Sequence, residues 1–249
     1  MDSSKPSSTS DQLNQFKTTH WNLVVSSKQS DVELRQQSLA ELCKLYWYPL
    51  FAYLRRKGHD PDAAADYVQG FFVELIDKSF LDSVEPEKGR FRWFMMSAIG
   101  RYVSNQRKRD QAQKRGGGQK LLSLNVDSAE QRYQREPDEG WTAEKLFDRR
   151  WALSILEQAL QRLSQIQAEK NKLELYNALQ STLSGIQMTG EQYAEIAERF
   201  SMSTGAVKVA ALRLREKYRQ ILVELVRQTV TDPDIVDGEL DELLSALSG

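Results

Sequence analysis

The segment from Tyr193 to Leu222, YAEIAERFSMSTGAVKVAALRLREKYRQIL, places small, apolar and basic residues in the pattern of a helix-turn-helix. Ile196 and Ala197 form the inner face of a short first helix, and Ala197 is small where the two helices must cross. Ser203 stands where its hydroxyl caps the second helix. Because the start of that helix enters the major groove in this motif, the segment predicts reading of base edges in duplex DNA.

The residues predicted to face DNA lie at the start and along the outer side of this second helix. Lys208 suits a phosphate or a guanine edge, and Val209 suits a thymine methyl group. The same pattern also fits an αα-hairpin whose basic face is only solvated, and the sequence leaves that alternative open. The predicted DNA-binding set is Ser203, Thr204, Gly205, Lys208, Val209, Arg213 and Arg215.

A second stretch, GRFRWFMMSAIGRYVSNQRKRDQAQKR from Gly89 to Arg115, joins an aromatic-rich helix start to a basic helix end. Aromatic rings stack on unpaired bases while cations hold the phosphates, so this combination suits single-stranded nucleic acid. Trp93 falls outside the predicted buried stripe of the helix. Two simpler explanations stay open: Trp93 packs against neighbouring helices, and the basic end only complements the helix dipole.

A third feature is the polar face that Asp62, Asp66 and Gln69 form on a helix predicted to begin at Pro61. Phe71 and Phe72 lie beside it in the sequence, and we expect them to be exposed aromatic residues. Such a face suits binding of another protein, or it is the solvated side of a core helix.

Residues for catalysis are scarce. The histidines are His20 and His59, without a plausible partner cluster, and Cys43 sits among apolar residues as a small buried hydrophobe. The glycines at 116–118 lack the Lys-Ser/Thr that follows a phosphate-binding loop. We therefore expect no enzymatic activity, no cofactor and no metal site.

Composition predicts a soluble, cytoplasmic protein with no membrane insertion. The 249 residues are 40% hydrophobic and 28% charged, and neither a secretory signal nor a run of about 20 apolar residues is present. The net charge of −1 hides an asymmetry, because 86–120 holds ten basic residues against Glu87 and Asp110, whereas 231–249 holds six acidic residues and no Lys or Arg. Since phosphate binding depends on local potential, the asymmetry permits DNA binding.

Helical periodicity dominates the chain, and the predicted fold class is all-α: two small helical domains joined by a flexible linker. Pro49 is expected to kink or break the first long helix. Asp60 and Pro61 mark the start of the next one. The predicted division is a disordered N-terminus 1–19, a first domain 20–115, a linker 116–140, a helix-turn-helix domain 141–230 and an acidic tail 231–249.

In this order the three stretches resemble the sigma-70 family, and within it the extracytoplasmic-function (ECF) sigma factors. The run YWYPLFAYLRRKGHDPDAAADYVQGFF resembles a planctomycete-type ECF group. The resemblance implies a sigma-2-like first domain, which binds core RNA polymerase and the −10 element, and a sigma-4-like second domain, which binds the −35 element. It departs from the family at Gly70, where Glu is more frequent, and at Arg101, where Asn is frequent.

The resemblance also assigns residues. It implies that Asp66 and Gln69 contact the β′ clamp coiled coil of the polymerase, and that the helix-turn-helix reads the −35 element. The positions implied for the −10 element are Trp93, Arg101, Asn105, Arg107, Lys108 and Arg109.

The predicted function is a sigma factor that binds core RNA polymerase and directs promoter recognition, strand opening and transcription initiation. Its partners are then core polymerase and promoter DNA, with an anti-sigma factor as a further partner that the resemblance allows. The alternative is a helix-turn-helix repressor or activator that is not a polymerase subunit, which leaves the basic-aromatic helix without a role.

The acidic tail carries Leu240, Leu243, Leu244 and Leu247 at helical spacing. Two interpretations remain open for it. The tail folds back on a basic surface and damps DNA binding, or it only solubilises the protein or docks a partner.

Overall fold

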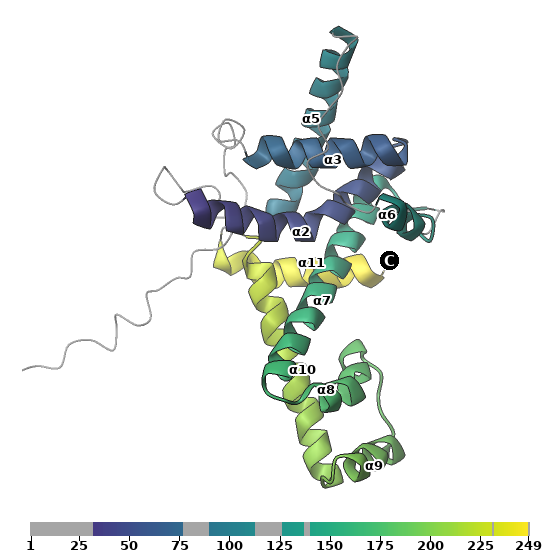
Figure 1. Ribbon diagram of the computed structural model, residues 1–249, viewed down its shortest axis with the longest axis vertical. Coiled ribbons are helices and arrows are strands. Elements are labelled where there is room, and N and C mark those ends of the chain that lie inside the picture. Colours follow the sequence, from purple (N-terminus) through teal and green to yellow (C-terminus); the bar gives the residue numbers. More distant parts are fainter. Residues whose placement is uncertain (1–31, 77–89, 113–125, 137–139, 231, 249) are drawn as a thin grey trace, which may run out of the picture.

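The computed structural model describes residues 32–76, 90–112, 126–136, 140–230 and 232–248, which are helical almost throughout (Figure 1). Within these ranges there is no β-strand, and the β-type pairing is one isolated antiparallel bridge between Arg90 and Val230. The predicted all-α fold class is confirmed. The predicted disordered segment 1–19 lies outside the described residues.

The described part of the first half of the chain contains α2 (Val32–Arg56), α3 (Pro61–Ile76) and α5 (Phe91–Ala112). Asp60 caps α3 as predicted, because its Oδ1 accepts a hydrogen bond of 2.9 Å from the backbone N–H of Ala63. α2 continues through Pro49, so of the two predicted effects, a kink or a break, the break is wrong. Proline removes one amide donor from the helix, and the burial of Leu45, Leu50 and Phe51 around it holds α2 together.

The predicted linker contains a helix, α6 (Val126–Tyr133). Arg55 of α2 binds Glu130 of α6 through two hydrogen bonds, of 2.7 and 2.8 Å, and the Tyr48 hydroxyl donates to Glu136 Oε1 over 2.9 Å. These polar contacts act together with a short apolar stripe, because Ala129 is buried and Val126 and Tyr133 pack against the core. The helix has only eight residues, so this stripe is too short to stand out as hydrophobic periodicity. The division of the chain into domains stays a prediction.

The second half begins with the long helix α7, and the helix-turn-helix segment and the acidic tail follow it. α7 and α10 pack against each other, and their ribbons cross at an angle in Figure 1. A left-handed Gly185, with φ 79°, ends the turn after α8. The elements are α7 (Ala143–Glu169), α8 (Leu173–Leu179), the 3-10 turn Gln180–Ser184, α9 (Gly190–Arg199), α10 (Thr204–Arg227), the 3-10 turn Pro233–Ile235 and α11 (Val236–Ser248).

α7 lies at the centre of the hydrophobic core, because α2, α10 and α11 all pack against it. Its residues Phe147, Trp151, Ile155 and Leu163 are completely buried. The Phe147 ring lies 6.3 Å from the ring of Tyr53 on α2, edge to face. One core therefore runs from α2 through α7 to α10, and the two halves of the chain are in contact.

Candidate nucleic-acid interface

The helix-turn-helix has the local geometry that its sequence predicts. α9 begins with a capping box, in which Thr189 and Gln192 satisfy each other's backbone N–H groups. The turn passes through Ser201, whose φ of 52° is left-handed, and Ser203 then caps α10 by accepting a hydrogen bond of 3.1 Å from Ala206. Val207, Ala211 and Leu214 of α10 are buried, with exposed fractions of 0, 0 and 6%.

The predicted −35 residues lie on the open side of this motif. Lys208 and Val209 are exposed, and Thr204 is half-buried at the first position of α10. The Lys208 ammonium lies 5.7 Å from the centre of the Tyr193 ring on α9, a cation–π contact that still leaves the cation at the surface. Ser203, Gly205, Arg213 and Arg215 are exposed as well.

The basic end of α5 points away from the body of the molecule (Figure 1). The predicted −10 residues Arg101, Asn105, Arg107, Lys108 and Arg109 are all exposed. Arg107 Nη2 lies 3.3 Å from Nε2 of His59. Partial burial and then the positive charge of Arg107 lower the pKa of His59, which keeps the ring neutral beside the guanidinium.

Trp93, the remaining predicted −10 residue, is 45% exposed and is not part of the core. The guanidinium groups of Arg90 and Arg92 lie 4.7 and 5.4 Å from the centre of its ring. Packing against neighbouring helices, the simpler explanation for this tryptophan, therefore accounts for only part of its surface. An exposed ring flanked by two cations is the arrangement that stacks an unpaired base.

The predicted polymerase-contact face of α3 is polar and accessible in part. Asp62 and Asp66 are exposed, and Gln69 is half-buried. The expectation that Phe71 and Phe72 are exposed is wrong, because both are core residues with exposed fractions of 0 and 3%. The phenylalanines continue the buried stripe of Val68 and Leu75, so hydrophobic burial outweighs their place beside the polar face.

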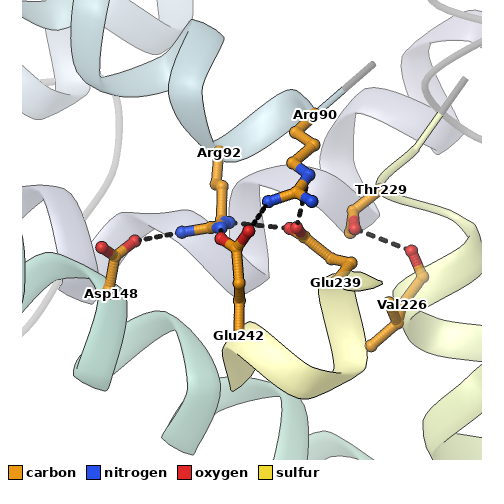
Figure 2. Close-up of polar contacts among 7 residues, drawn as sticks. All are labelled: Arg90, Arg92, Asp148, Val226, Thr229, Glu239 and Glu242. Atoms are coloured by element: carbon orange, nitrogen blue, oxygen red, sulfur yellow. Dashed lines mark hydrogen bonds and ion pairs between the residues drawn. The ribbon is translucent and has the colours of Figure 1, made fainter. Parts of the chain in front are cut away.

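An ionic cluster that sequence reasoning missed joins α5, α7 and α11 (Figure 2). Arg92 of α5, only 3% exposed, binds Asp148 of α7 over 2.5 Å and Glu239 of α11 over 2.8 Å. Arg90 Nε lies 3.1 Å from the second oxygen of Glu239, in ionic contact but without hydrogen-bond alignment. Both arginines also bind Glu242.

Burial raises the pKa of Asp148 above its usual range, against the lowering effect of Arg92. The cluster lies where the chain leaving α10 meets the start of α5. There the backbone N–H of Phe91 donates to the carbonyl of Thr229 over 3.0 Å, next to the Arg90–Val230 bridge. The only sequence signal for it was complementary charge, RFR at 90–92 and ELDE at 239–242, separated by about 150 positions in the chain.

Within the described ranges, no group of three or more His, Cys, Asp or Glu side chains is placed to hold a metal ion. Nor do these residues include a helix whose length and apolar character would let it span a membrane. The surface features that stand out are therefore the two basic helical surfaces and the polar face of α3.

The family model that describes the ECF sigma factor matches residues 49–224, which include α3, α5 and the whole helix-turn-helix. The chain belongs to the ECF sigma factor family. No curated protein and no solved structure matches the chain.

Membership fixes the broad function: this ECF sigma factor acts in transcription initiation as a DNA-binding regulatory protein. The family is not enzymatic, which agrees with the scarcity of catalytic residue types. The match begins within α2 at Pro49 and ends within α10 at Glu224. α11, with Glu239 and Glu242, therefore lies beyond the match, whereas Arg90, Arg92 and Asp148 lie within it.

Proposed function

We propose that this ECF sigma factor binds core RNA polymerase through the polar face of α3, reads duplex DNA at the −35 element with the start of α10, and holds opened DNA at the −10 element with α5. The observation that carries the proposal is the pair of exposed basic surfaces at opposite ends of the molecule (Figure 1). One is the open side of the helix-turn-helix, and the other is the basic end of α5, whose start carries the exposed Trp93.

Two different DNA chemistries suit these two surfaces. The start of α10 offers Lys208, Val209 and the Ser203 cap to base edges and phosphates in a major groove. α5 offers the exposed ring of Trp93 to a base that has left the stack, an event that costs a few kcal/mol and therefore needs such a partner. Because both surfaces belong to one chain, each binds at a high effective concentration once the other is bound.

The test is reconstitution of transcription. Purified protein mixed with core polymerase should direct run-off transcripts from defined start sites on genomic fragments. A repressor or activator that is not a polymerase subunit would bind duplex DNA without core polymerase and give no transcript, and this outcome would reject the proposal.

A matched pair of variants tests the contact with core polymerase. Asp66→Asn should weaken co-purification with core polymerase, while Asp237→Asn, which neutralises an exposed carboxylate on α11, should not. Equal binding by both variants would remove Asp66 from the polymerase interface.

A further inference from the structure

α11 covers the start of α5 with its carboxylates. Glu239 is completely buried against Arg90 and Arg92, and Glu242 binds both arginines while its own side chain stays 42% exposed (Figure 2). The two arginines in turn flank Trp93. The acidic end of the chain thus neutralises the cations nearest the exposed tryptophan.

The groups that α11 neutralises are suited to a nucleic acid. Guanidinium groups donate to phosphate oxygens as they donate to carboxylate oxygens, so Glu239 and Glu242 occupy donors of Arg90 and Arg92 that could bind phosphate. Trp93 beside them supplies a ring for stacking. With α11 in place, Arg90 is only 15% exposed and Arg92 only 3%, and neither can reach an external phosphate.

α11 is exposed along much of its surface. Its outer side is solvated at Asp237 and Asp241, and Leu244 is 60% exposed. It packs on α7 and α10 with two buried apolar residues, Val236 and Leu243, while Leu240, Ala246 and Leu247 are partly buried against the core. Helices with few fully buried apolar residues open at a lower free energy than the core around them.

We propose that α11 is an autoinhibitory latch: its carboxylates occupy a phosphate-binding site formed by Arg90 and Arg92, and its release opens this site, with Trp93, to single-stranded promoter DNA. The latch rests on the proposed function in that α5 is the helix assigned to opened DNA. It also gives a role to Glu239 and Glu242, the two carboxylates of α11 that bind the arginines at the start of α5.

The experiment measures binding of a fluorescent single-stranded DNA of mixed sequence by anisotropy over a range of salt concentrations, with the full chain. Glu242→Gln removes one negative charge of the latch at a half-exposed position. The control, Asp241→Asn, removes one negative charge at the preceding residue, which is exposed and lies outside the cluster. We expect Glu242→Gln to bind about fivefold tighter than both wild type and Asp241→Asn, with a salt slope steeper by about 0.7 for each additional phosphate that the opened site binds. Arg90→Ala combined with Glu242→Gln should lose this increase in affinity.

Equal affinity and equal salt slope for Glu242→Gln and Asp241→Asn would overturn the latch, and so would an increase in affinity that survives Arg90→Ala. A lower melting temperature of Glu242→Gln without tighter binding would show that the cluster serves stability alone, and would overturn it too. Run-off transcription tells failure of the latch apart from failure of the proposed function. Tighter binding of single strands without transcripts from any variant would keep the latch and reject the sigma role.

Discussion

Replacing Arg92 with Met should destabilise the protein strongly. The Arg92 side chain is 3% exposed, and it binds the fully buried Glu239. Without Arg92, the remaining cation near Glu239 among the described residues is Arg90. Its Nε lies 3.1 Å from Glu239 Oε2 but makes no hydrogen bond to it. Removing one partner of a buried pair costs about 3–5 kcal/mol, because the other charge is left uncompensated. Since Arg90 still offsets part of this charge, we expect the lower end, about 3 kcal/mol, or a melting temperature lower by about 6–12 °C.

Urea unfolding followed by circular dichroism at 222 nm measures this loss directly, because the described residues are almost all helical. The control is the double variant Arg92→Met with Glu239→Leu, in which neither charge remains buried. Apolar replacement of a buried pair is often neutral, so the double variant should recover more than half of the loss. A loss below about 1 kcal/mol in the single variant, or no recovery in the double variant, would refute the reasoning about buried charge.

Three further predictions concern the two DNA surfaces and the single thiol. Lys208→Ala should weaken binding to promoter duplex and reduce the salt slope by about 0.9, the share of one phosphate contact; an unchanged slope would show that Lys208 does not touch the backbone. Trp93→Ala should impair strand opening, measured by permanganate reactivity, more than duplex binding. Because the Trp93 ring is 45% exposed, the melting temperature of the Trp93→Ala protein should fall by less than about 3 °C. A larger fall would mark Trp93 as a packing residue. Burial raises the pKa of the Cys43 thiol from 9.0 to about 12. Because the thiolate is the reactive form, the folded protein at pH 8 should react with iodoacetamide about a thousandfold more slowly than the unfolded chain. Comparable rates would contradict this pKa.

Local signals in the sequence were sufficient for most helices. The apolar spacing of Phe147, Trp151 and Ile155 predicts α7, and Asp60 with Pro61 predicts the start of α3, because burial and capping act over a few neighbouring residues. The helix-turn-helix is predictable for the same reason. Its cap, its turn and its buried stripe all lie within about 30 residues.

Pairings between distant charged residues could not be predicted in this way. α6 is held to α2 by Arg55 and Glu130, which are 75 positions apart, and Arg92 meets Glu239 across 147 positions. Sequence reasoning predicts that an arginine near the start of an aromatic helix is solvent-exposed. The carboxylates that compensate its charge when it is buried are far away in the sequence, so no neighbouring residue indicates them. Hydrophobic periodicity likewise could not tell that Phe71 and Phe72 both face inward, since adjacent helical residues point about 100° apart.

Gly70 limits which residues of related proteins can be substituted into α3 of this protein. A Cβ at this position would overlap the hydroxyl of Tyr102, whose ring packs edge to face on Phe71 at 5.9 Å. Any residue with a side chain at position 70 therefore requires the Tyr102 hydroxyl to move. Grafting of α3 from a relative must treat positions 70 and 102 as one unit, and the two should vary together among closely related chains.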